Sequence, residues 1–246
     1  MTRSVFLILF SILSTCAAAQ EIAITFDDAP IPNGPLFSGD ERARRLIQTL
    51  QKYQVKEAAF FVLTKYADIE RLPRLKQYSD AGHLLANHSH RHLWIHEAGT
   101  REYIRDIGIA DSILSAFPNY QRWYRYPFLD EGRTKSARDS IRQALSQMEL
   151  RNGYVTIDNY DWYLNSLLAK AMEANKKVNR AALRDVYVEH ICNSVSFYDA
   201  VAREHLGRSP RHVLLLHEND LAALFLEDVL ERLKQEGWKF ISAREA

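Results

Sequence analysis

The sequence contains few of the residues that mark unusual classes of protein. Its 246 residues include only 2 Cys, 9 Gly and 7 Pro, which excludes a disulfide-rich scaffold, a collagen-like chain and a Gly/Pro-rich disordered chain. Neither sign of charge is in excess, since 32 basic side chains stand against 31 acidic ones. Because a nucleic-acid binder needs a basic surface, we expect no nucleic-acid partner.

Long apolar runs are also missing. No segment offers the roughly 20 consecutive apolar residues that a membrane-spanning helix needs. A shorter apolar run, Val5–Leu13, follows Arg3 and precedes three consecutive alanines at 17–19, which is the order of a secretory signal peptide. We therefore predict a signal peptide at 1–19 and an exported protein, periplasmic or secreted, of residues 20–246.

The two cysteines allow a second interpretation of the N-terminus. Cys16 follows Leu13, Ser14 and Thr15, so a lipoprotein signal with a membrane tether at Cys16 is the alternative to a cleaved leader. Removal of 1–19 leaves Cys192 as the only cysteine, which then has no internal disulfide partner. We expect Cys192 to be buried as a small hydrophobic residue.

Segments typical of strands alternate with segments typical of helices. A capping box at Ser38 and Glu41 predicts a helix start, and Leu226, Val229 and Leu233 repeat at helical spacing. Such alternation predicts a mostly parallel sheet, either an open doubly wound sheet or an incomplete β/α barrel. The predicted strands are 22–26, 58–63, 83–87, 122–126, 154–157, 212–216 and 238–241. A long helical stretch at 166–206 predicts an insertion that walls the site.

Polar side chains lie at or just after the carboxyl ends of these predicted strands. Ligands bind at that edge of a parallel sheet in both architectures. The polar residues at these ends are Asp27, Asp28, His88, Arg125, Asp158 and His217.

Histidines and carboxylates at these ends suggest a metal site. Five of the 9 histidines fall between His83 and His96, and the spacing of His88 and His92 brings both to one side of a turn. A solvated His-rich loop would explain the same cluster. The pair Asp27 and Asp28 favours the metal, because two adjacent carboxylates at the end of an apolar strand need a cation or donors to be buried.

Five short motifs, taken in order, resemble those of the polysaccharide deacetylase family, also called carbohydrate esterase family 4. The motifs are Thr25-Phe26-Asp27-Asp28, His88-Ser89-x-x-His92, Arg125-x-Pro127, Asp158-x-x-Asp161-Trp162 and Leu215-x-His217. The resemblance implies a distorted, incomplete β/α barrel of about seven parallel strands. It also implies a divalent metal, most often Zn²⁺, and hydrolysis of N-acetyl groups on amino sugars.

The resemblance assigns roles to individual residues. Asp28, His88 and His92 are the expected metal ligands, and Asp27 is the expected general base. His217 is the expected general acid. Arg125 is expected to pair with Asp27, and Asp161 with His217. The substrate is expected to meet Phe128 near the oxyanion donor and an apolar patch of Trp162 and Leu215 at the acetyl methyl.

Two departures from the family pattern leave the substrate open. Ala29 stands where the family usually has Gly, and Phe128-Leu129 stands where it has an aromatic residue and Gly. Aromatic residues for stacking on sugars are Trp94, Trp123, Tyr126 and Trp162. The expected substrate is a chitin-like oligomer, peptidoglycan or an exopolysaccharide. An O-acetyl esterase acting on glycans and a non-catalytic glycan-binding module are the alternatives.

Overall fold

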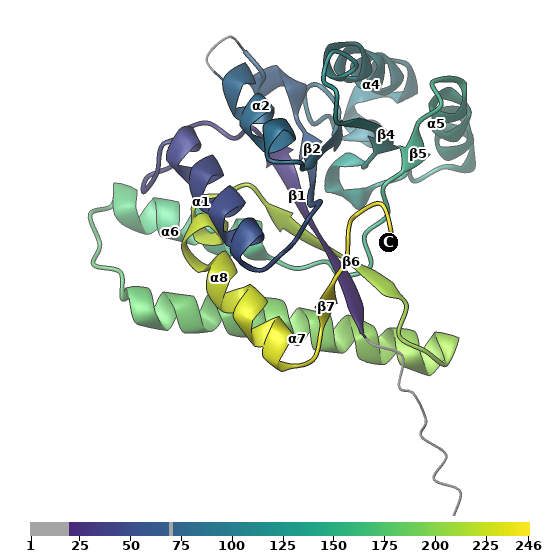
Figure 1. Cartoon of the computed structure of the whole chain (residues 1–246). Coiled ribbons are helices and arrows are strands. Elements are labelled where there is room, and N and C mark those ends of the chain that lie inside the picture. The colour runs from purple at the N-terminus through teal and green to yellow at the C-terminus, as the bar shows by residue number, and fades with distance from the viewer. Residues whose placement is uncertain (1–19, 69–70) are drawn as a thin grey trace, which may run out of the picture.

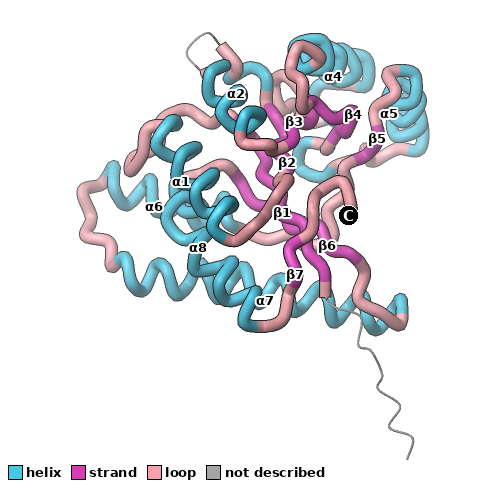
Figure 2. The backbone as a smooth tube through the Cα atoms, in the orientation of Figure 1, coloured by secondary structure: helices cyan, strands magenta, loops and turns pink. Residues whose placement is uncertain are grey.

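A single parallel sheet organises the protein. The computed structural model describes residues 20–68 and 71–246, so the predicted signal peptide and the alternative lipid site lie outside the described residues. The 7-stranded sheet has the order β5-β4-β3-β2-β1-β6, and β7 pairs with β1. It curls into an incomplete barrel with helices outside it (Figure 1, Figure 2), which confirms the predicted fold class. The strands are β1 (Glu21–Ala29), β2 (Ala59–Val62), β3 (Leu84–Asn87), β4 (Tyr120–Tyr124), β5 (Arg151–Asn152), β6 (Arg211–His217) and β7 (Lys239–Phe240).

The central strands are apolar runs buried on both faces. Ile22, Ile24 and Phe26 of β1 are fully buried, and so are Phe60 and Leu214 of its neighbours β2 and β6. Parallel strands covered on both sides read as continuous hydrophobic runs for this reason. Buried Cys192 confirms the expectation for that residue.

The helices pack on the outside of the sheet. Ser38 caps α1 by accepting a hydrogen bond from the backbone N–H of Glu41, as the predicted capping box requires. None of the helices in the described ranges is both long and apolar enough to cross a membrane. The α-helices are α1 (Gly39–Lys52), α2 (Leu72–Asp80), α3 (Ile95–Ala98), α4 (Thr100–Leu114), α5 (Lys135–Gln147), α6 (Asp161–Glu173), α7 (Arg180–Leu206) and α8 (Asp220–Gln235), with 3₁₀ turns η1 (Thr64–Tyr66) and η2 (Pro127–Leu129).

The fifth strand was predicted in the wrong place. The structure has β5 at Arg151–Asn152, whereas 154–157 leads from β5 to β6 and makes one isolated bridge, Ile157 to Leu214. Ile157 is fully buried, so its β-forming character reflects packing rather than a ladder. The chain leaves the sheet at Gly153, directly after β5. Only glycine fits at this position, because a Cβ there would lie 2.6 Å from the ring of Phe61.

The predicted insertion consists of α6 and α7. It begins at Asp161 rather than at residue 166, and α7 packs on α8 through Tyr187, Ile191 and Val195. In Figure 1, α7 runs along the base of the molecule. Only the first turn of α6, at Trp162, lines the candidate site described below, so the body of the insertion does not wall it.

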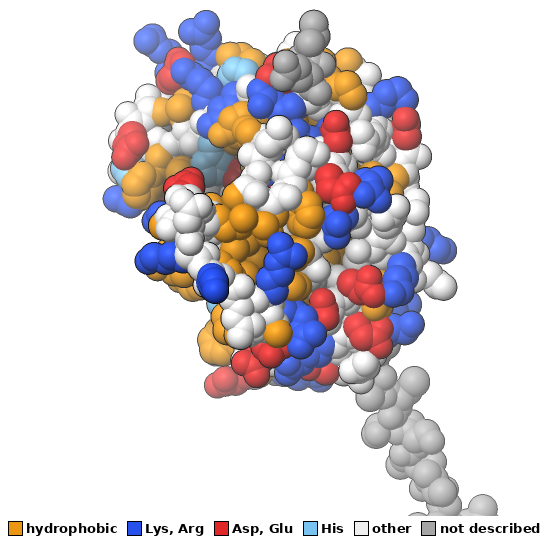
Figure 3. Space-filling view, turned by 90° about the vertical axis from the view of Figure 1, so that its left-hand side faces the viewer, with side chains coloured by type: hydrophobic (Ala, Val, Ile, Leu, Met, Phe, Trp, Pro, Cys, Tyr) orange, Lys and Arg blue, Asp and Glu red, His pale blue; other side chains and the backbone are white. Residues whose placement is uncertain are grey.

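Hydrophobic side chains gather on one outer face. Figure 3 shows them over the middle of the side where α1 and α6 lie in Figure 1. A hollow of about 210 Å³ is lined by Leu36 before α1, Leu168 and Met172 of α6, and Leu224 of α8.

Candidate active site

A pocket of about 410 Å³ opens at the carboxyl ends of β1, β3 and β6. This is the edge of the sheet where the sequence placed its polar residues. The pocket is lined by Asp27, Asp28, His88, His92, Tyr126, Phe128, Leu129, Asp158, Tyr160, Trp162, Leu215 and His217. Residues up to 190 positions apart in the chain therefore converge on one cavity.

Three side chains in this pocket form a potential metal site. The Nε2 atoms of His88 and His92 lie 3.6 Å and 3.7 Å from Oδ1 of Asp28, and the three ligand atoms all lie within 4.8 Å of one another. Burial lowers the pKa of His88 to about 3 and also lowers the pKa of His92, so both imidazoles are neutral and able to ligate.

The local contacts fit a divalent ion such as zinc. Ligand bonds of about 2.0–2.2 Å in tetrahedral geometry put ligand atoms roughly 3.3–3.6 Å apart, close to the distances to Asp28. Oδ1 of Asp28 is buried and accepts no hydrogen bond from the described residues. Nδ1 of His88 lies 2.9 Å from the carbonyl oxygen of Arg125, which fixes the proton on Nδ1 and leaves Nε2 free to bind a metal.

An irregularity in β1 turns two adjacent acids toward the same pocket. Consecutive residues of a regular strand face opposite sides. The register of β1 against β2 shifts between Phe26 and Ala29, and Asp28 has φ 68°, a left-handed conformation. The two acids thus share one pocket because of a bulge within the strand and not because the strand ends there.

Asp27 is held by a buried arginine. Nη1 of Arg125 donates to Oδ1 of Asp27 over 2.6 Å and to the hydroxyl of Thr25 over 2.9 Å, while Nε donates to the carbonyl oxygen of Gly153. Both Arg125 and Asp27 are almost fully buried. The second oxygen of Asp27 lies 3.7 Å from Nε2 of His88, so it faces the potential metal site.

His217 ends β6 with its ring in the pocket. Nδ1 lies 2.7 Å from Oδ1 of Asp161, and the other oxygen of Asp161 accepts from the backbone N–H of His217 and the side chain of Asn219. Burial acts to lower the pKa of His217, but the charge and hydrogen bond of Asp161 outweigh it and raise the pKa to about 9. The imidazole is therefore protonated at neutral pH.

The loop that carries the two candidate histidine ligands folds around a buried acid. Oδ2 of Asp106 accepts hydrogen bonds from the backbone N–H groups of His90 and Arg91, and its Oδ1 binds the Arg91 guanidinium. The hydroxyl of Ser89 accepts from the N–H of His92. Sequence reasoning missed Asp106, because a single acid inside a helical pattern carries no local signal.

A second buried carboxylate supports the loop that follows the acid pair. Glu218 is fully buried and accepts from the N–H of Ile31, the hydroxyl of Tyr78 and the guanidinium groups of Arg42 and Arg74. Its own N–H donates to the carbonyl oxygen of Asp27. Glu218 therefore ties the chain on both sides of Asp28 to the strand that carries His217, and it too was missed.

Strained backbone surrounds the pocket. Non-glycine residues with positive φ cost about 1–3 kcal/mol each and persist where surrounding contacts enforce them. Leu129 has φ 52° at the position where the family usually has Gly. A leucine is strained in this conformation, whereas a glycine would not be. The other residues with positive φ near the pocket are Asp28, Ser89, His92 and Phe128.

The predicted stacking residues fall into three environments. Trp162, which is 49% exposed, and Tyr126 line the pocket. Trp94 packs beside Phe128 and His96 instead, and its indole N–H donates to Asp130. Trp123 lines a neighbouring hollow.

The three remaining histidines of the His83–His96 cluster have other partners. Nδ1 of His90 contacts the hydroxyl of Thr64, His96 lies by Asp130, and buried His83 accepts from the N–H of Ala58.

The sequence profile of the family described as "Polysaccharide deacetylase" matches residues 14–153, more than half of the chain. The chain belongs to the polysaccharide deacetylase family. A peptidoglycan-N-acetylglucosamine deacetylase of Bacillus cereus is 25% identical to this family member over 235 residues, which cover 91% of this chain and 86% of the relative.

Solved structures share the fold. A family 4 carbohydrate esterase pseudoenzyme of Bacillus anthracis matches with a TM-score of 0.65 at 18% identity, covering 93% of this chain and 65% of that one. A peptidoglycan deacetylase of Bacillus subtilis matches with a TM-score of 0.61 at 19% identity, covering 93% of this chain and 90% of that one. The fold of this polysaccharide deacetylase family member is thus shared by pseudoenzymes and by proteins named as deacetylases.

Proposed function

We propose that the protein is a divalent-metal-dependent enzyme that removes acetyl groups from N-acetylated amino sugars of a glycan. The observation that carries the proposal is the convergence of three metal ligands, a paired carboxylate and a protonated imidazole in one pocket. A glycan-binding module that had lost activity would have no need of a strained, charged site of this composition.

Asp28, His88 and His92 would hold the ion, and zinc is the expected one. Two imidazoles and one carboxylate leave a tetrahedral ion with an open position for water or substrate. When bound, the ion supplies Lewis acidity and makes its water easier to deprotonate. Asp27, fixed by Arg125 and facing the metal site, accepts the proton from the attacking water.

His217 donates the proton that the departing amine needs. Cleavage of an amide releases a basic nitrogen, which leaves readily only when it is protonated. Asp161 keeps the His217 ring oriented by its hydrogen bond to Nδ1 and presents the opposite edge of the ring to the pocket. A protonated imidazole at neutral pH suits amide hydrolysis more than ester hydrolysis, which has a less basic leaving group.

The substrate is proposed to be a glycan that contains N-acetylglucosamine, with peptidoglycan and chitin-like oligomers as the two candidates. The named activity of the Bacillus cereus relative supports this class. Leu215 and Trp162 line the pocket and offer an apolar surface for the acetyl methyl, while exposed Phe128 borders the oxyanion position. Burying that methyl is worth about 1 kcal/mol.

Residues 20–246 are proposed to be the catalytic domain of an exported protein. The proposal rests on the signal-like segment 1–19 in the sequence and on the extracytoplasmic position of the candidate substrates. Edman sequencing of the mature protein tests it: a start at Gln20 supports cleavage, whereas an uncleaved Met1 contradicts it.

The function is tested by acetate release from N-acetylglucosamine oligomers, peptidoglycan fragments and an O-acetylated xylan, assayed side by side with zinc and with a chelator. We expect zinc-dependent release from an N-acetylated substrate. Asp27→Asn serves as the inactive control, because Asn keeps the shape of the side chain but cannot accept the proton. Zinc-loaded protein that releases no acetate from either N-acetylated substrate would refute the proposal, and release from the xylan alone would indicate an O-acetyl esterase instead.

A further inference from the structure

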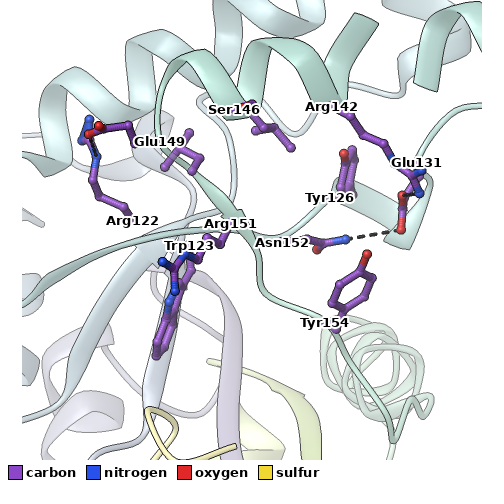
Figure 4. A pocket seen from close by; sticks show the side chains of 12 residues that line it. Arg122, Trp123, Tyr126, Glu131, Arg142, Ser146, Glu149, Arg151, Asn152 and Tyr154 are labelled. Atoms are coloured by element: carbon purple, nitrogen blue, oxygen red, sulfur yellow. Dashed lines mark hydrogen bonds and ion pairs between the residues drawn. The ribbon is translucent and has the colours of Figure 1, made fainter. Parts of the chain in front are cut away.

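A second hollow lies beside the candidate active site and is not used by the proposed chemistry. It has a volume of about 850 Å³ and opens at β5 and α5, where Trp123, Arg142, Arg151 and Tyr154 line it (Figure 4). Tyr126 lines both cavities. The two cavities therefore adjoin each other at Tyr126, which is itself almost fully buried.

Among the described residues, one arginine of the hollow has no acidic partner. Arg142 pairs with Glu131 at 2.7 Å, and Arg122 lies 3.3 Å from Asp111 and 4.0 Å from Glu149. Arg151, an exposed residue of β5, has no ion pair or hydrogen bond from its side chain within residues 20–68 and 71–246. Both acids that line the hollow thus have their own partners, and the guanidinium of Arg151 is uncompensated.

The polar groups of the aromatic residues in the hollow can each donate a hydrogen bond. Within the described part of the chain, no hydrogen bond engages the indole N–H of Trp123 or the hydroxyls of Tyr126 and Tyr154. Figure 4 shows Tyr126 and Tyr154 on either side of Asn152, whose amide donates to Glu131. Tyr154 is 62% exposed, so its ring offers a flat apolar face beside these donors.

Together these groups define the chemistry of a ligand. An uncompensated guanidinium binds a carboxylate, with two parallel hydrogen bonds where the geometry allows. Aromatic faces pack against the C–H face of a sugar ring, and hydroxyl and indole donors suit its oxygens. We infer that this hollow is a subsite for a carboxylate-bearing sugar unit of the same glycan whose N-acetyl group enters the pocket. The inference rests on the proposed function and narrows it to an acidic glycan.

The test compares one glycan in two charge states. Acetate release is measured on peptide-free peptidoglycan strands, whose muramic acid units carry a carboxylate, and on the same strands after methyl esterification, alongside neutral N-acetylglucosamine oligomers. We expect Arg151→Gln to raise KM about fivefold to tenfold on the free acid, the size of a lost charge-assisted hydrogen bond at an exposed site, with kcat unchanged. KM on the ester and on the neutral oligomers stays at the wild-type value.

Two further variants separate the subsite from general effects. Tyr154→Ala is expected to raise KM about threefold on the acid and on the ester alike, because stacking of a sugar on the tyrosine ring does not depend on the charge of the sugar. Arg208→Gln serves as the matched control, since Arg208 is an exposed arginine that precedes β6 at the opposite end of the sheet.

An Arg151→Gln variant with unchanged KM on the free acid, or with the same rise on acid and ester, overturns the inference. Wild-type acetate release from either the acid strands or the neutral oligomers tests the proposed function separately. If that activity is absent, binding of the acid strands to the protein and to Arg151→Gln is measured instead, and equal affinities overturn the subsite.

Discussion

Two histidines of the same strand, His212 and His217, are each bonded to an aspartate, yet their environments give them opposite properties. His212 near the start of β6 has both ring nitrogens engaged, Nδ1 at 3.0 Å from the Thr156 hydroxyl and Nε2 at 3.3 Å from Asp199. Burial lowers its pKa, whereas the pKa of His217 is raised to about 9.

The carboxylate partners explain the difference. Asp199 also accepts hydrogen bonds from Gln20 and from Arg203, so its charge is shared with a cation. Asp161 has no arginine or lysine partner among the described residues and is fully buried. We propose that the His217–Asp161 pair supplies a proton donor because, among the described residues, its carboxylate has no cationic partner besides His217, and because the second ring nitrogen of His217 reaches the pocket.

The largest expected effect comes from replacing the two histidines in the same way. His217→Asn is expected to lower kcat by about 10²–10⁴, the usual contribution of a general acid. His212→Asn leaves kcat within about twofold and instead lowers the free energy of unfolding by about 1–3 kcal/mol through its buried hydrogen bonds. Steady-state kinetics and urea unfolding of both variants make the comparison. Equal losses of kcat would remove the distinction between the two sites.

Replacing the aspartates tests whether the partner sets the difference. Asp161→Asn is expected to lower kcat about 10²-fold, because the protonated imidazole loses its counter-charge. Asp199→Asn is expected to affect stability rather than rate, since it frees Arg203 and His212 but touches nothing in the pocket. A loss of activity in Asp199→Asn at unchanged stability would contradict this assignment.

The pH profile of kcat is expected to report the protonation of His217. A proton donor is active below its pKa, so activity falls as pH rises through the pKa of about 9. Asp27 and Asp28 contribute to that raised pKa, and a bound cation offsets them, so the alkaline limb lies at or below that value. In Asp161→Asn the limb moves to lower pH by about one to two units. An alkaline limb that is the same in both proteins would rule out His217 as the titrating acid.

A smaller effect on rate than that of His217 or Asp161 is expected from Glu218, the buried carboxylate next to His217. Glu218→Gln removes the charge that faces Arg42 and Arg74, and we expect about 2–3 kcal/mol lower stability together with about tenfold lower kcat. Glu231→Gln is the matched control, because Glu231 is exposed and bonds only to side chains outside the pocket. Loss of stability without any change in kcat would confine Glu218 to a folding role.

The parts of the site that the sequence predicts share one property, namely that they follow apolar strands. Asp27, His88 and His217 end segments whose hydrophobic character is local, and parallel strands bring those ends to one edge. Asp106 and Glu218 escaped prediction because their partners come from distant segments and no short-range pattern identifies them. The fifth strand was misplaced for a related reason, since Ile157 is buried by packing on β6 rather than by a ladder.

Zinc binding tests the central claim most directly, and isothermal titration calorimetry of metal-stripped protein measures it. We predict one equivalent of zinc bound by the wild type and by His96→Ala, whose ring lies by Asp130 rather than in the pocket, and at least about a hundredfold weaker binding by His92→Ala. A wild-type protein that binds no zinc, or a His92→Ala variant that binds it as tightly as the wild type, would contradict the account.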